Sequence, residues 1–268
     1  MTKISQPTSK HRNFCIFVPD LFLFIRTSGI IGTIESGCPY QMARMDTFDR
    51  QQSLLTTLYQ DYRQTHDARY FVEQVQKHYN EASLVRLTGS MCVETRRGAA
   101  LALGFVGTYQ ASNPQANNAL GSLLKDRDRS VRLIAESSLK SIWSRDGSER
   151  QRQELYAVMR LIAEQKFGEA VSRANILLDE YPSYIEARNQ RAIALFALKQ
   201  FENSIEDSQI VLDLNPYHFG AAIGMGHAYL QLRNKPEAIE CFHKALEINP
   251  NLDTVRRHLE RITQSWTI

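Results

Sequence analysis

Three prolines, Pro182, Pro216 and Pro250, recur in this chain at an interval of 34 residues, each at the end of an apolar stretch. A proline lacks the amide hydrogen that an α-helix needs, and its ring clashes with the preceding turn, so each of the three marks a helix end. A chain that places the same helix stop at one fixed interval repeats one supersecondary unit. The sequence therefore predicts an all-α fold, an α-solenoid of stacked helix pairs.

Within each interval, two amphipathic segments flank a short polar turn, which reads EQKFGEA, LKQFENS and LRNKPEA in successive units. Small residues recur where two helices must approach closely, and large apolar residues recur where a gap must be filled. In the last unit these positions are held by Gly226, Tyr229, Ala238, Phe242 and Ala245. Ser183 and Glu186 have the capping-box spacing, which predicts that a helix restarts directly after Pro182.

The last unit, GAAIGMGHAYLQLRNKPEAIECFHKALEINP, closely resembles the tetratricopeptide repeat, and the resemblance covers about residues 151–250. The first two units depart from the family pattern where an aromatic residue or a glycine is usual. The stretch LDTVRRHLERITQSW, from Leu252 to Trp266, has the pattern of the solvating end helix that such arrays need. The resemblance implies three helix pairs and a capping helix over residues 150–268.

A second repeat precedes the first. Shifting the sequence by 36 residues superposes ETRRGAALALGFVG on SVRLIAESSLKSIW and aligns Arg96 with Arg132. An aspartate-rich turn, followed by valine-arginine and an alanine/leucine helix, resembles the HEAT repeat. In that repeat a turn aspartate bonds the arginine that begins the second helix of a neighbouring unit, and the residues that match this motif here are Asp126 or Asp128 and Arg132. We expect a HEAT-like domain over residues 45–149, with a plain helical bundle as the alternative.

The short junction SRDGSER, residues 144–150, is too short for a flexible linker. We therefore expect the two arrays to pack against one another as a continuous all-helical superhelix.

The first 44 residues differ from the rest of the chain and carry its whole net charge of +3. The run FCIFVPDLFLFI resembles the apolar core of a secretory signal, but Pro19 and Asp20 interrupt it. A helix-like pattern begins directly after Met45. We expect residues 1–44 to be a disordered tail or a mis-assigned start, with a targeting segment or an amphipathic anchor as the alternatives.

The composition points to a cytoplasmic protein without a cofactor. With 32 basic and 29 acidic residues, bulk charge requires neither a nucleic acid nor a membrane as partner. No run of about 18 apolar residues occurs, which predicts no membrane-spanning helix. The cysteines lack metal-ligand spacing and predict reduced thiols; they are Cys15, Cys38, Cys92 and Cys241. A phosphate-binding loop, a zinc-protease motif and a serine elbow are all missing, so we expect no enzyme activity, no metal and no small-molecule cofactor.

In the tetratricopeptide family, ligands usually lie in a concave groove against the inner side of the first helix of each pair. The positions predicted to line such a partner-binding groove are Met159, Asn189, Ile193, Phe196, Ile223, His227, Arg257 and Arg261. Leu155, Ile162 and Leu230 fall on the same side. Because the set is apolar at one end and basic at the other, it suits an extended peptide or an amphipathic helix with an acidic end.

Some family members hold a carboxyl terminus in a clamp of lysine, asparagine and arginine. The matching positions include Leu155, Met159, Gln190, Gly220 and Gly224, which do not support that function.

These observations favour a non-catalytic adaptor that binds protein or peptide partners. One alternative is an enzyme or accessory subunit acting on a bilin-carrying protein, since some HEAT-like proteins are bilin lyases or isomerases. A nucleic-acid-associated scaffold is the other, because a basic group could contact phosphates: Arg96, Arg97, Arg127, Arg129 and Arg132. Interleaved Glu94, Asp126 and Asp128 favour local ion pairs for this group instead.

Overall fold

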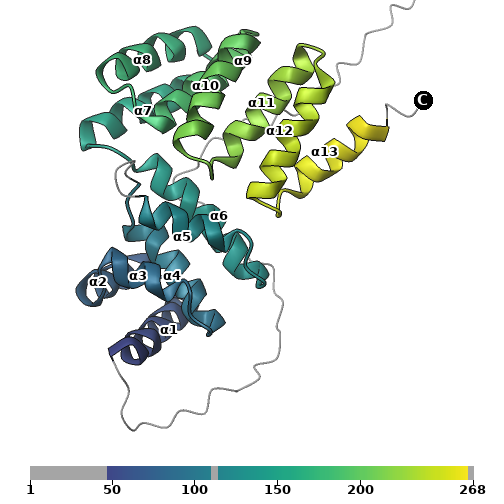
Figure 1. Ribbon diagram of the computed structural model, residues 1–268. Helices are drawn as coiled ribbons and strands as arrows, with labels where there is room; N and C mark the ends of the chain where they lie inside the picture. The colour runs from purple at the N-terminus through teal and green to yellow at the C-terminus, as the bar shows by residue number, and fades with distance from the viewer. Residues whose placement is uncertain (1–46, 110–113, 265–268) are drawn as a thin grey trace, which may run out of the picture. The chain divides into compact units, whose positions relative to one another are not determined.

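The computed structural model describes residues 47–109 and 114–264, which form thirteen α-helices and no β-strand (Figure 1). The first six helices are α1 (Thr47–Thr65), α2 (Ala68–His78), α3 (Glu81–Leu87), α4 (Val93–Val106), α5 (Gln115–Leu123) and α6 (Arg129–Ser144). The other seven are α7 (Glu149–Ala163), α8 (Phe167–Glu180), α9 (Ile185–Ala197), α10 (Phe201–Leu214), α11 (Phe219–Gln231), α12 (Lys235–Ile248) and α13 (Asp253–Gln264). The all-α prediction is confirmed. The predictions for residues 1–44, and for Met45 as a start, lie outside the described residues.

The 34-residue period builds three successive helix pairs, α7/α8, α9/α10 and α11/α12, with α13 packed against α12. The turn inside each pair contains one residue in the left-handed conformation, Gln165, Lys199 and Arg233, with φ angles of 60°, 63° and 60°. The repeat therefore extends to the backbone dihedral angles. Close packing explains the small residue at position 226, since a Cβ at Gly226 would lie 2.7 Å from the ring of Phe242.

The predicted capping box of Ser183 and Glu186 is wrong. The N-cap residue of α9 is Tyr184, and no side chain caps this helix end. Glu186 is instead buried, with 8% of its surface exposed, and bonds other side chains of the core. The complete capping box of this array lies at the start of α7 and is formed by Ser148 and Gln151.

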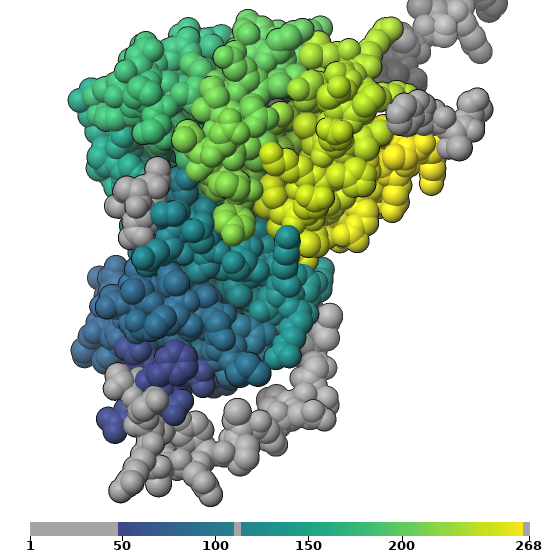
Figure 2. Space-filling view, viewed as in Figure 1, coloured from purple at the N-terminus to yellow at the C-terminus, as the bar shows by residue number. Residues whose placement is uncertain are grey.

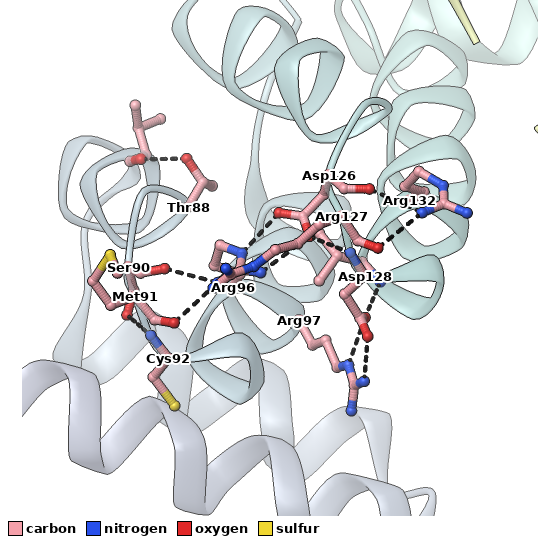
Figure 3. Close-up of polar contacts among 12 residues, drawn as sticks. Thr88, Ser90, Met91, Cys92, Arg96, Arg97, Asp126, Arg127, Asp128 and Arg132 are labelled. Carbon is pink, nitrogen blue, oxygen red and sulfur yellow. Dashed lines mark hydrogen bonds and ion pairs between the residues drawn. The ribbon is translucent and has the colours of Figure 1, made fainter. Parts of the chain in front are cut away.

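The turn before α6 carries the aspartates that the sequence predicted to bond a neighbouring helix. Arg96 of α4 donates to both carboxylate oxygens of Asp126, at 2.7 and 3.0 Å (Figure 3). Arg97 donates in the same way to Asp128, at 3.0 and 2.8 Å. The turn aspartates thus bond arginines of the preceding helix pair, whereas Arg132, which the sequence matched to this motif, donates to the backbone carbonyl of Asp126 and to no turn carboxylate among the described residues. The assignment of residues 45–149 to the HEAT family stays a prediction.

Arg132 occupies in α6 the position that Arg96 occupies in α4. Each arginine donates to two carbonyls of the turn that precedes its own helix, those of Asp126 and Arg127 for Arg132 and those of residues 90 and 91 for Arg96. The side-chain partners of the two arginines differ. Arg96 bonds Asp126, whereas Arg132 donates to Asn251, between α12 and α13, at 2.7 Å. An arginine of the amino-terminal helices α1–α6 therefore bonds a turn of the carboxy-terminal helices α7–α13.

Helices α5 and α6 lie against the turns that precede α11 and α13 (Figures 1 and 2). The ring of Trp143 stacks on His218 with centroids 4.4 Å apart, and Asn249 donates to Glu136 at 3.0 Å. One apolar core continues across this contact from Leu55 of α1 to Ala245 of α12. The two arrays are in direct contact at the turns between helix pairs, and the continuous superhelix stays a prediction. The division into domains at residues 149 and 150 stays a prediction.

In the described parts of the chain, no helix has both the length and the apolar character that crossing a membrane requires.

Candidate functional site

The structure distributes the predicted groove residues over four helices, α7, α9, α11 and α13, which we call the inner helices. Helix α9 packs beside both α7 and α11, and ring contacts join α11 to α13. We define the inner-helix face as the set Met159, Asn189, Ile193, Phe196, Ile223, His227, Arg257 and Arg261. Six of these residues are half-buried and the two arginines are exposed, so each one keeps contact with solvent.

The apolar part of this face lies on α7 and α9. Met159 and Ile193 each pack against a small buried cluster, and the ring of Phe196 meets that of Phe201 edge-on at 5.4 Å. Leu155 and Ile162, which the sequence placed on the same side, are only 0% and 3% exposed. They fill the gap between α7 and the neighbouring helices, so they are core residues and cannot touch a ligand.

The middle of the face is organised by a buried carboxylate. Glu186 Oε1 accepts hydrogen bonds from Asn189 at 3.0 Å and Gln190 at 2.7 Å. Burial acts to raise the pKa of Glu186, but the hydrogen bonds from His218, Gln190 and Asn189 outweigh it and lower that pKa below its usual value. Glu186 thereby fixes the amide of Asn189 on the surface of α9.

The orientation of His218 follows from its two neighbours. Its Nδ1 accepts from the backbone amide of Ala221 at 3.1 Å, so the proton belongs on Nε2, which lies 3.4 Å from Glu186 Oε2. The opposite side of this buried group reaches α5, since the indole of Trp143 donates to Asn117 at 2.8 Å. The face is thus connected through α9 and α11 to the amino-terminal helices.

Two histidines form the next part of the face. The ring of His227 lies 5.2 Å from Phe242 and 5.4 Å from His258. Burial, and then the nearby His258, lower the pKa of His227 to about 4, so this ring is neutral at physiological pH. The sequence missed His258, whose Nε2 is buried without a hydrogen-bond partner among the described residues. The residue one repeat earlier, Gly224, carries no side chain and gave no signal for this position.

The basic end of the face lies on α13. The Nε atoms of Arg257 and Arg261 contact only backbone carbonyls of their own helix, at 3.4 and 3.3 Å. Neither guanidinium forms an ion pair within the part of the chain that the structure describes. Two exposed guanidinium groups one turn apart can each bind a carboxylate through paired hydrogen bonds.

Of the other basic group that the sequence singled out, Arg127 and Arg129 are exposed, while the other three arginines are bonded within the fold. Arg96 is bonded to Asp126 with side-chain exposures of 7% and 9%, and Arg97 is bonded to Asp128. Arg132 is held by Asn251 and its own turn. These three guanidinium groups are therefore occupied by protein partners, which weighs against a phosphate-binding surface here. Over the described ranges, the acidic, histidine and cysteine side chains form no cluster that could hold a metal.

Residues 221–252 match the tetratricopeptide repeat family model. A TPR repeat-containing protein of Rhizobium etli is 22% identical over 142 residues, which cover 53% of this chain and 70% of that protein. Among solved structures, the first TPR of Spaghetti (RPAP3), bound to the HSP90 peptide SRMEEVD, is 24% identical with a TM-score of 0.43, covering 46% of this chain and 97% of that one. MamA AMB-1 is 18% identical with a TM-score of 0.35, covering 76% of this chain and 98% of that one.

The match over residues 221–252 falls on the pair α11/α12 and the turn before α13. This pair carries the glycine, aromatic and alanine positions that the sequence identified, and the pairs α7/α8 and α9/α10 repeat its geometry at the same 34-residue interval. Helices α11 and α12 therefore form a tetratricopeptide repeat, and the two preceding helix pairs share its 34-residue period.

Proposed function

We propose that this protein is a non-catalytic adaptor that binds a peptide or helix of a partner protein along the inner-helix face. The observation that carries the proposal is the exposure of this face. All eight of its residues reach solvent, whereas Leu155 and Ile162 beside them are buried. A surface that keeps methionine, isoleucine and phenylalanine side chains partly exposed in a row offers apolar anchor sites for an extended ligand.

The charge distribution indicates which ligand fits. Most of the apolar side chains lie on α7 and α9, while the two exposed arginines lie on α13. His227 lies between them and is neutral at physiological pH, so it contributes a hydrogen bond and no charge. The matching partner is an extended peptide or an amphipathic helix with apolar anchors at one end and acidic side chains at the other.

A clamp for a terminal carboxylate is not part of this proposal. Of the positions that would form it, Leu155 is buried, Gln190 is 7% exposed and bonded to Glu186, and Gly220 and Gly224 carry no side chain. The acidic group that we expect is therefore an internal run of aspartate or glutamate, bound by Arg257 and Arg261.

The test begins with selection of peptides from a random display library on the purified full chain, followed by fluorescence anisotropy of the enriched peptides. We expect enriched peptides to combine apolar and acidic residues. The double variant Arg257→Glu/Arg261→Glu should weaken their binding at least tenfold, because it replaces two positive charges with two negative charges that repel the acidic run. The control Lys235→Glu/Lys244→Glu changes the net charge equally on exposed positions of α12 and should alter binding less than twofold. Equal losses in both variants, or enriched peptides without acidic residues, would contradict the proposal.

A further inference from the structure

A histidine of α13 lies inside the basic end of the inner-helix face. Arg261 is one helical turn from both Arg257 and His258, so the three side chains share one side of this helix. The ring of His258 lies 5.4 Å from that of His227 on α11 and 5.4 Å from that of Phe242 on α12. His258 is half-buried, whereas the two arginines are exposed. An anion bound by the two guanidinium groups therefore comes close to this imidazole.

The surroundings of His258 oppose a positive charge on its ring. The Nε2 atom is buried and has no hydrogen-bond partner among the described residues. A protonated imidazole presents an N–H donor at this atom, and a buried donor without an acceptor costs free energy. Burial, and then the nearby charge of Arg261, lower the pKa of His258 below its ordinary value. Without a partner, the ring is therefore neutral at physiological pH.

The helices packed around this ring bring no charge that would favour its protonation. On α11 the facing group is His227, which is itself neutral at physiological pH because its pKa is about 4. On α12 the facing group is the uncharged ring of Phe242, and on α13 it is the positive charge of Arg261. No carboxylate of the described chain forms an ion pair with His258. What these surroundings lack is a negative charge.

We propose that the basic end of the inner-helix face binds the acidic part of its partner together with a proton, which His258 takes up. Carboxylates bound by Arg257 and Arg261 offset the positive charge beside the imidazole and add negative charge near it, and both effects favour the protonated ring. A group that holds its proton more tightly in the complex makes the complex tighter as the pH falls. This inference rests on the proposed function, because it needs an acidic partner at these arginines.

The pH range from 5.5 to 7.5 separates this coupling from simple attraction between charges. Arginine stays protonated and aspartate stays ionised throughout the range, since their ordinary pKa values are about 12.5 or higher and about 3.9. Attraction between these two groups alone leaves the affinity unchanged. His227 stays neutral in this range too, because its pKa is about 4. A change in affinity that depends on His258 therefore reports the uptake of a proton by this ring.

Isothermal titration calorimetry of the full chain with hexa-aspartate, blocked at both ends, tests the coupling. We expect binding at least threefold tighter at pH 5.5 than at pH 7.5, with proton uptake measured by comparing buffers of different ionisation enthalpy. His258→Gln keeps a polar side chain of good helix propensity that does not titrate, so its affinity should be equal at both pH values. The matched control His243→Gln removes an exposed histidine of α12 and should keep the full pH dependence.

The outcomes separate this inference from the proposed function. Equal affinity at both pH values, or a pH dependence that persists in His258→Gln, would overturn the coupling and leave the peptide-binding proposal in place. An absence of binding at either pH would refute the acidic end of the proposed function and the coupling with it. If His258→Gln fails to fold, NMR titration of the histidine rings in the unaltered chain decides. Hexa-aspartate should then raise the pKa of His258, and an unchanged titration curve would overturn the inference.

Discussion

Replacing Arg96 by alanine tests whether the turn before α6 is held by a buried ion pair. Arg96 and Asp126 have side-chain exposures of 7% and 9%, and two hydrogen bonds of 2.7 and 3.0 Å join them. Removing one member of a buried pair leaves the other charge unpaired, at a cost of about 3–5 kcal/mol. Arg96 also donates to the carbonyls of Ser90 and Met91, so Arg96→Ala additionally removes two bonds inside the preceding turn.

We therefore expect Arg96→Ala to lower the free energy of unfolding by about 3 kcal/mol or more. For a chain of this size, that loss lowers the melting temperature by roughly 6–12 °C. Urea unfolding followed by circular dichroism measures the change. The matched control is Arg69→Ala, because Arg69 pairs with Glu73 at 90% and 60% side-chain exposure, and such a surface pair is worth about 0.5 kcal/mol.

A double-mutant cycle isolates the pair itself. Asp126→Ala should also destabilise, but adding it to Arg96→Ala should cost less than the sum of the two single effects, because the second change removes a charge that is already unpaired. If Arg96→Ala costs less than about 1 kcal/mol, or if the two effects add, the buried pair does not hold this turn and the reasoning is refuted.

Two further changes test other parts of the array. Gly226→Ala places a Cβ 2.7 Å from the ring of Phe242, so it should destabilise the chain by about 1–3 kcal/mol in urea unfolding, while Gly168→Ala, which meets no atom within 4 Å, should not. Burial, and then the nearby Glu186, raise the pKa of Asp146 to about 6, well above the value of about 4 expected in the unfolded chain. The folded state then holds the proton more tightly, so stability should fall as pH rises from about 4 to about 6 and stay level above that. Asp146→Asn should remove this fall and stabilise the chain at pH 7.5; a thermal-unfolding series over this pH range in which both proteins behave alike would contradict the assignment.

Much of the array could be predicted because helix formation depends on near neighbours. The prolines at 182, 216 and 250 each follow a helix end by two residues, and the turns inside the pairs fall where the polar segments predicted them. The pattern also placed the eight residues of the inner-helix face on the correct helices. The capping box at Ser183 failed because the neighbouring Glu186 meets His218, 32 residues further along, and this distant partner binds the carboxylate that a cap would have used.

Burial was harder to predict than helical position. Leu155 and Met159 lie on one side of α7 at a one-turn spacing, and both look suited to a ligand. Only the packing of Tyr184 and Leu177 over Leu155 makes one of them core and leaves the other at the surface. His258 was missed for a related reason, since its importance comes from the ring of His227 on another helix.

The sequence by itself determined the repeat, its period, its helix ends and the tetratricopeptide match of the last helix pair. The tertiary structure alone decided the partner of each charged side chain. Arg96 and Arg132 occupy matching positions of one sequence repeat, yet Arg96 bonds Asp126 within the amino-terminal helices and Arg132 bonds Asn251, between α12 and α13. The physical reason is range: helical periodicity is set by residues three and four positions apart, whereas a guanidinium group bonds whichever acceptor the folded chain brings within about 3 Å.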